Sequence, residues 1–174
     1  MQPWRDIFKY SIKAGDFVKV DEEINIAKRY LQILDIRFEG RFKWNVDIAE
    51  ELLECRSIKM IFQPLVENAA YHGLEKTYNE GYIIIKGWRE QDSMIFEIRD
   101  NGIGFEPVKL EAMRKVLANK ELLEAESRTR QRIGIANIQW RIKLMLGDQY
   151  GLSVTSDEGK ETIVRLSLPY ENRY

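Results

Sequence analysis

Apolar residues recur every three or four positions between residues 58 and 70, and they define one face of an amphipathic helix. The face consists of Ile58, Ile61, Phe62, Leu65, Val66, Ala69 and Ala70. A face of this width needs another layer to pack against, so the helix predicts a sheet or further helices beneath it. Ser57 is a candidate N-cap and Gly73 a candidate end. Because Pro64 lies inside the stretch, we expect a helix start or a kink near Gln63.

Alternation of apolar and polar residues predicts strands on both sides of this helix. Five strands are expected, at 42–47, 81–89, 94–99, 152–156 and 162–168. Helical spacing predicts four further helices, at about 4–14, 21–38, 107–117 and 135–146. Polar turns join the second strand to the third and the fourth strand to the fifth, so we expect each of these two pairs to form a hairpin. We therefore predict an α+β fold, a two-layer α/β sandwich with a mixed, mostly antiparallel sheet and helices on one face.

The totals restrict the class of protein. The chain has 174 residues, enough for one domain with a substantial core, and 44% of them are hydrophobic while 32% are charged. A net charge of −1 argues against a nucleic-acid partner. The single cysteine, Cys55, excludes an internal disulfide and fits a reducing compartment. The sequence contains no apolar run near the roughly 18 residues of a membrane helix.

The polar face of the central helix carries the first candidate site residues. With Ile58 at the centre of the buried face, the opposite arc holds Pro64, Glu67, Asn68, Tyr71 and Glu75. The amide oxygen of Asn68 is a suitable ligand for Mg²⁺, although an ordinary solvated face has the same pattern. His72 lies at the border of the two faces, where a phosphate contact and a boundary role are both open.

Two glycine-containing stretches follow. Asp100-Asn101-Gly102-Ile103-Gly104 comes directly after a predicted strand, and its carboxylate is suited to accept a hydrogen bond from an exocyclic amine such as that of adenine. Arg132-Ile133-Gly134-Ile135 lies at a predicted helix start, where free N–H groups and the helix dipole favour an anion. An Asn-Gly turn and a solvated basic loop are the alternative interpretations. The charged residues 118–131 are interpreted as a mobile lid, helical in part.

Together these stretches resemble the ATP-binding domain of sensor histidine kinases, in the superfamily that also contains gyrase, Hsp90 and MutL. Residues 63–73 resemble the N box in the form found in LytS/YesM-like kinases, residues 100–104 the G1 box, and residues 133–137 the G2 box. The resemblance implies that residues 1–15 are the remnant of a dimerisation helix. It implies that residues 16–174 form the catalytic domain, with a lid at about 106–133.

The resemblance also implies the roles of individual residues. Asn68 would hold Mg²⁺, Asp100 would bind the adenine amino group, and Glu67 is a candidate base or orienting group. The remaining ATP-binding candidates are Tyr71, His72, Gly102, Ile103, Gly104, Arg132, Ile133, Gly134, Ile135 and Thr162. The ATP γ-phosphoryl would pass to a histidine on a separate dimerisation domain and then to a response regulator.

Three positions depart from the family pattern. Hydrolases of the superfamily carry a water-activating glutamate four residues before the asparagine, where this chain has Pro64, so transfer is favoured over hydrolysis. Many histidine kinases have a basic phosphate contact three residues after the asparagine, where this chain has Tyr71; His72 or a lid arginine could replace it. The G2 box keeps one glycine, Gly134, with Arg132 where another is common.

The sequence contains no acceptor motif upstream of the N box, so we expect a piece of a longer protein that binds Mg-ATP without phosphorylating itself. We expect this piece to be a monomer and the parent to be a homodimer. The parent would be anchored in the bacterial plasma membrane, with this domain in the cytoplasm. A serine kinase of the anti-sigma type and a nucleotide-binding interaction module without transfer activity are the alternative functions.

Overall fold

The computed structural model describes residues 15–39, 42–73, 81–127 and 134–170. Its main sheet has five strands, which are β2 (Phe42–Ile48), β4 (Gly81–Glu90), β5 (Ser93–Asp100), β6 (Gly151–Asp157) and β7 (Glu161–Pro169). Their order across the sheet is β2-β4-β5-β7-β6. β2 pairs with β4 in parallel and the other pairs are antiparallel, so the predicted mixed, mostly antiparallel sheet is confirmed.

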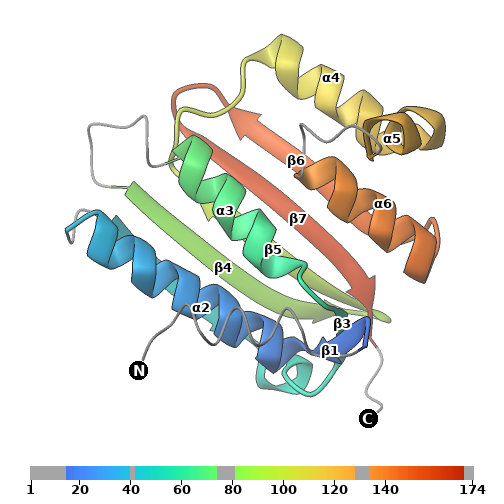
Figure 1. The fold of residues 1–174 in the computed structure, drawn as a ribbon, viewed down its shortest axis with the longest axis horizontal. Coiled ribbons are helices and arrows are strands. Elements are labelled where there is room, and N and C mark those ends of the chain that lie inside the picture. The colour runs from blue at the N-terminus through green and yellow to red at the C-terminus, as the bar shows by residue number, and fades with distance from the viewer. Residues whose placement is uncertain (1–14, 40–41, 74–80, 128–133, 171–174) are drawn as a thin grey trace.

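Helices cover one face of this sheet (Figure 1). α2 (Val20–Arg37), α3 (Phe62–Gly73) and α6 (Ile135–Leu146) lie over the strands, while α4 (Pro107–Ala118) and α5 (Lys120–Ser127) lie beyond β6. The helices predicted at 21–38, 107–117 and 135–146 are confirmed, as is partial helicity within 118–131, whereas 4–14 lies outside the described residues. Among the described helices, none combines the length and the apolar character that crossing a bilayer requires.

The core lies between the helices and the sheet because alternate strand residues point to the same side. Met94, Phe96 and Ile98 of β5 are buried together with Val164, Leu166 and Leu168 of β7. Phe62 of α3 meets Phe96 edge to face, with ring centroids 4.9 Å apart and planes at 86°. Complete burial of side chains of this size stabilises the fold by roughly 1.5–3 kcal/mol each. This packing sets α3 across the middle of the sheet.

The start of α3 corrects one prediction. Ser57 is not an N-cap, because it lies in β3 (Arg56–Ile58), which pairs with β1 (Phe17–Lys19). Its hydroxyl donates instead to the carbonyl of Ile58 at 3.4 Å. Between β2 and β3 the chain forms only the short 3-10 helix η1 (Glu50–Leu52). α3 begins at Phe62, so the predicted start near Gln63 is confirmed and Pro64 lies in the first turn, where its missing N–H needs no partner.

A buried carboxylate from α2 holds the N-terminus of α3. Glu23 is only 1% exposed, and it accepts hydrogen bonds from three consecutive backbone N–H groups. The donors are Met60 at 2.6 Å, Ile61 at 2.8 Å and Phe62 at 3.1 Å. A negative charge at this position satisfies donors that the helix itself leaves unpaired and favours the positive end of the helix dipole.

Arg141 of α6 fixes the same segment from the carbonyl side. Its guanidinium donates to the carbonyl oxygens of Lys59 at 2.7 Å and Met60 at 3.2 Å. Met60 has a φ of 59°, a left-handed conformation that is unfavourable for a residue with a side chain. Contacts from α2 and α6 therefore hold the turn before α3 in one conformation, and this turn determines where the following helix places its side chains.

Candidate functional site

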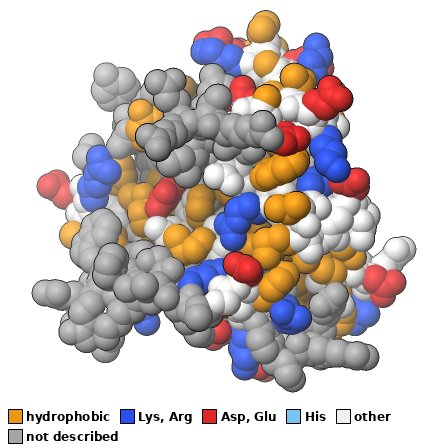
Figure 2. All heavy atoms as spheres, turned by 45° about the vertical axis from the view of Figure 1, so that its right-hand side comes forward, with side chains coloured by type: hydrophobic (Ala, Val, Ile, Leu, Met, Phe, Trp, Pro, Cys, Tyr) orange, Lys and Arg blue, Asp and Glu red, His pale blue; other side chains and the backbone are white. Residues whose placement is uncertain are grey.

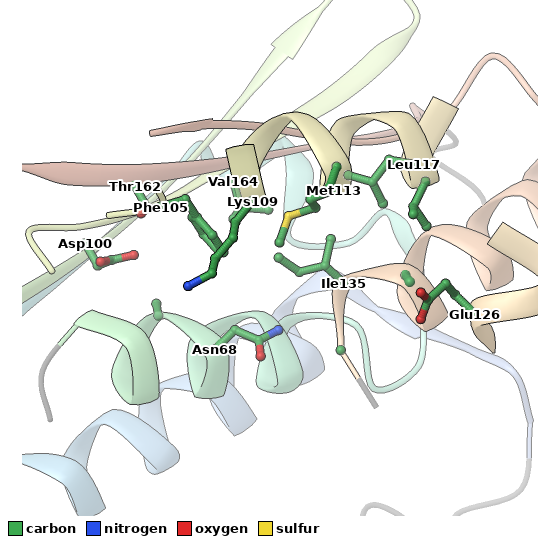
Figure 3. Close-up of a pocket in the computed structure, with 15 residues that line it drawn as sticks. Asn68, Asp100, Phe105, Lys109, Met113, Leu117, Glu126, Ile135, Thr162 and Val164 are labelled. Carbon is green, nitrogen blue, oxygen red and sulfur yellow. The ribbon is translucent and has the colours of Figure 1, made fainter. Parts of the chain in front are cut away.

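A cavity of about 640 Å³ lies where the three predicted stretches meet (Figure 3). The lining residues from these stretches and from β7 are Asn68, Ala69, Asp100, Gly134, Ile135, Ala136, Thr162 and Val164. Its other described lining residues are Phe105, Lys109, Ala112, Met113, Val116, Leu117 and Glu126. A volume of this size is typical of sites for small molecules and cofactors. The structure thus brings Asn68, Asp100 and Gly134 to one cavity from three separate parts of the chain.

Asp100 is the buried acid of the cavity, with only 4% of its surface exposed. The N–H of Gly102 donates to its Oδ1 at 2.9 Å, and its carboxyl group points toward the cavity in Figure 3. Burial raises the pKa of Asp100 to about 6; the hydrogen bond from Gly102 lowers it, and the nearby charge of Glu161 raises it. The group is therefore an ionised acceptor at neutral pH, held in one orientation by the loop that follows it.

That loop is fixed against the turn between β6 and β7. Gly104 has a φ of 67°, and a Cβ there would lie 2.5 Å from the carbonyl oxygen of Asp157, so only glycine fits. The N–H of Gly159 donates to the carbonyl of Ile103 at 2.8 Å. Neither Gly102, Ile103 nor Gly104 lines the described cavity. Their geometry instead fixes the position of Asp100 and of the residues after Gly104.

The hydroxyl of Ser156 connects the loop to the opposite strand. It accepts a hydrogen bond from the N–H of Phe105 at 2.9 Å and donates to the carbonyl of Glu161 at 2.9 Å. It also lies 3.0 Å from Oγ1 of Thr162. Because the single hydroxyl proton of Ser156 is used by Glu161, we assign Thr162 as the donor of this contact. Thr162 stands opposite Asp100 in the β5–β7 register, with an acceptor left for a group in the cavity.

Replacement of Ser156 by alanine is expected to lower the free energy of unfolding by about 1 to 2 kcal/mol. The variant removes the oxygen to which the N–H of Phe105 and the hydroxyl of Thr162 donate. Urea denaturation would measure the effect, with Ser153→Ala as the control, since Ser153 is an exposed residue of the same strand. Equal losses in the two variants would contradict a specific role for Ser156.

Asn68 lies beside the start of α6. A Cβ at Gly134 would lie 3.7 Å from Nδ2 and 3.8 Å from Oδ1 of Asn68. Nδ2 is buried and has no hydrogen-bond partner among the described residues, an arrangement that is unfavourable unless a ligand supplies one. Gly134 caps α6 with no side-chain hydrogen bond to the first turn, which leaves N–H groups at the helix start for an anion.

The residues around Asn68 suit a cation that takes most of its ligands from water and from a bound anion. The described residues contain no group of three or more His, Cys, Asp or Glu side chains placed to hold a metal. A cation held by the oxygen of Asn68 would therefore complete its shell with water and with oxygens of a bound anion. Mg²⁺ binds in this manner at phosphate-containing sites.

Two predicted site residues lie elsewhere on α3. Glu67 and Tyr71 line a separate small hollow of about 60 Å³, together with the α2 residues Tyr30, Leu34 and Arg37. Glu67 accepts a hydrogen bond from Nε2 of Gln63 at 2.8 Å, and Tyr71 is 59% exposed. The structure does not bring them to the cavity, and their roles stay predictions. The side chain of His72 falls outside the described part of the chain, as do Arg132 and Ile133.

Sequence reasoning missed the wall that α4 contributes. Lys109, Met113 and Val116 follow helical spacing and line the same side of the cavity. Phe105 extends this wall from the preceding loop. The available signal was a lysine at the head of an otherwise apolar stripe, but α4 carries apolar residues on other sides too, so the spacing alone did not identify this face.

Charges of both signs are interspersed on the side of the molecule that Figure 2 presents, with apolar side chains between them. In that view the described residues form no continuous basic surface. The arrangement differs from the basic stripe by which proteins bind the phosphate backbone of nucleic acids.

Comparison with known proteins identifies the family. Residues 55–172 match the family described as histidine kinase-, DNA gyrase B-, and HSP90-like ATPase. The chain belongs to this family. Within it, the sensor histidine kinase YesM of Bacillus subtilis (strain 168) is 32% identical over 157 residues, which are 90% of this chain and 25% of YesM. The sensor histidine kinase BtsS of Escherichia coli (strain K12) is 28% identical over 166 residues, 95% of this chain and 26% of BtsS.

The solved structures agree on the fold of this family member. Histidine kinase ThkA, in a complex with the response regulator protein TrrA, matches with a TM-score of 0.60 at 16% identity, over 98% of this chain and 47% of that chain. The predicted two-layer fold and the resemblance to sensor histidine kinases are therefore confirmed. The chain spans about a quarter of the length of the two curated relatives named above.

Proposed function

We propose that this chain is the catalytic domain of a two-component sensor histidine kinase and that it binds Mg-ATP in the 640 Å³ cavity. The observation that carries the proposal is the placement of two chemically different groups in one cavity. Asp100 and Thr162 provide buried acceptors on one side, and Asn68 with the start of α6 provides a cation ligand and free N–H groups on another (Figure 3). A nucleotide has a base and an anion to match these groups.

The base end of the ligand would lie against Asp100. The carboxylate accepts a hydrogen bond from the adenine amino group, and the acceptor of Thr162 lies next to it. Phe105, Met113 and Val164 supply apolar walls for a flat ring. The phosphates would extend toward Gly134, where the N–H groups of the helix start favour negative charge.

Phosphoryl transfer depends on position and charge neutralisation. Asn68 would orient the phosphates through Mg²⁺, which neutralises their charge when it is bound. Pro64 offers no side chain to activate water, so we infer transfer to a protein group rather than hydrolysis. Glu67, one residue before Asn68 and directed toward α2, remains our candidate for orienting the acceptor.

The acceptor would be a histidine on a dimerisation domain that is not part of this chain. A response regulator would then receive the phosphoryl group, and the complex of ThkA with TrrA supports such a partner. We infer that the parent is a homodimer anchored in the plasma membrane and that this domain, a monomer by itself, works in the cytoplasm. Sensor histidine kinases about four times as long as this chain support this arrangement.

The Asn68→Ala variant tests the proposal. We expect its affinity for Mg-ATP to fall at least tenfold in titration calorimetry, because the variant removes the only predicted protein ligand of the cation. Removal of Mg²⁺ with EDTA should reduce the difference between the variant and the parent. Asn45→Ala, which changes an exposed asparagine of β2, is the matched control. Unchanged Mg-ATP affinity in the Asn68 variant would reject this assignment of α3.

A further inference from the structure

We propose that Lys109 is a phosphate-binding residue of the cavity and that nucleotide binding transfers its ammonium group from Glu106 to the polyphosphate. The inference rests on the proposed function, since it requires a nucleotide in the cavity. It assigns to α4 the positive charge that the N box of this chain lacks at Tyr71.

The position of Lys109 is the first observation. Lys109 lies in the first turn of α4 and lines the cavity. In Figure 3 its side chain extends from α4 into the cavity, and Nζ lies between Asp100 and Asn68. This is the region that a ligand with its base at Asp100 and its phosphates at Asn68 would cross. In this view the ammonium group therefore lies between the two ends that such a ligand would occupy.

The charges of the cavity are the second observation. Among its described lining residues, the ionisable side chains are those of Asp100, Glu126 and Lys109. The two carboxylates repel an anionic ligand, and within the described lining Lys109 is the only positively charged side chain that would attract one. A lysine in the first turn of a helix is also disfavoured by the helix dipole, so local helix stability does not account for it.

The present partner of Lys109 is the third observation. Nζ lies 2.9 Å from Oε1 of Glu106, and the two side chains are 68% and 57% exposed. An exposed pair three residues apart contributes little to stability, because water solvates both charges. A polyphosphate inside the cavity carries more negative charge than one carboxylate, and its oxygens also accept charge-assisted hydrogen bonds. We therefore expect Lys109 to exchange Glu106 for phosphate when a nucleotide binds.

At the position three residues after Asn68, the N box provides no such charge. Tyr71 is neutral, 59% exposed, and lines the hollow that faces α2 instead of the cavity. Lys109 would reach the phosphates from the opposite wall, since α4 and α3 both line the cavity. The same electrostatic requirement would thus be met from a different element of the fold.

Lys109→Met is the test, measured by titration calorimetry with ATP, ADP and adenosine in the presence of Mg²⁺. We expect affinity for ATP and ADP to fall by about 5- to 30-fold, as for the loss of one charge-assisted hydrogen bond. Affinity for adenosine should change by less than about twofold, because adenosine has no phosphate. Lys115→Met is the matched control, since Lys115 is exposed on the same helix and does not line the cavity.

Two further variants keep the proposal falsifiable. Lys109→Arg preserves the charge and should stay within about threefold of the parent. Glu106→Gln releases the lysine and should bind ATP as well as the parent or better. An equal loss for adenosine and ATP in Lys109→Met would show an effect on cavity shape and overturn the proposal. ATP binding that is unchanged in Lys109→Met but lost in Asn68→Ala would overturn it while leaving the proposed function intact, whereas no ATP binding by the parent would overturn both.

Discussion

Asp100→Asn is expected to weaken ATP binding by about 30- to 150-fold, as for a lost acceptor that becomes an opposed donor. The amide oxygen of the variant would keep the hydrogen bond from Gly102, which is made at 2.9 Å in the parent. The amide NH₂ group would then face the adenine amino group, so two donors would meet. Titration with adenosine isolates this effect, because adenosine has no phosphate that titrates in the same pH range.

The same variant is expected to be more stable than the parent at neutral pH. Burial raises the pKa of Asp100 from its ordinary value of 3.8 to about 6, so the folded state binds this proton more tightly than the unfolded state. The stabilising contribution of the proton is complete below about pH 4 and is lost as the pH rises through about 6. At pH 8 the ionised carboxylate therefore disfavours folding by roughly 3 kcal/mol.

Urea denaturation at pH 4 and pH 8 measures this prediction. We expect Asp100→Asn to unfold with a free energy about 1 to 3 kcal/mol above that of the parent at pH 8. The difference should approach zero at pH 4, where the parent carries a neutral carboxyl group. Asp47→Asn, which changes an exposed aspartate of β2, is the control. If Asp100→Asn is less stable than the parent at pH 8, the prediction that the buried carboxylate destabilises the fold is wrong.

Glu23→Ala is expected to lower the free energy of unfolding by about 3 to 5 kcal/mol, the range for loss of one partner of a buried charged contact. Three backbone N–H groups would lose their acceptor, and Met60 would lose a contact that holds its left-handed conformation. Because α3 starts at this turn, Mg-ATP affinity should fall as well, even though Glu23 does not line the cavity.

Chemical denaturation of Glu23→Ala, Glu23→Gln and a surface control measures how much of the free energy of unfolding depends on the hydrogen bonds that Glu23 accepts. Glu23→Gln keeps one side-chain oxygen as an acceptor, so its loss should be intermediate. Glu50→Ala removes an exposed carboxylate from η1 and should change stability by less than about 0.5 kcal/mol. A loss below about 1 kcal/mol in Glu23→Ala would mean that water or another group replaces the carboxylate.

The elements themselves could be predicted from the sequence. Strand alternation located the β4–β5 hairpin, and helical spacing located α2, α4 and α6. These patterns succeed because burial of one face imposes a period on the residues of each element. The start of α3 shows where local patterns fail. Ser57 has the residue type of an N-cap, but pairing between β1 and β3 placed it in a strand.

The candidate site also has one part that could be predicted from the sequence and one part that could not. Asn68, Asp100, Gly134 and Thr162 could be named from sequence, because their motifs are contiguous and adjoin helix or strand ends. The cavity that they share, and the directions of Glu67 and Tyr71 away from it, follow from how α3 packs between its neighbours. A helical angle separates polar from apolar faces, but it does not state which neighbour each polar side chain meets.

The sequence by itself determined the order of helices and strands, the family, and the residues that carry its motifs. Only the tertiary structure decided that Glu23 caps a helix 37 to 39 residues later in the chain and that Lys109 joins the cavity wall. The physical reason is that periodicity records whether a side chain is buried, whereas these roles depend on which distant group it meets. That choice is made when the layers pack together.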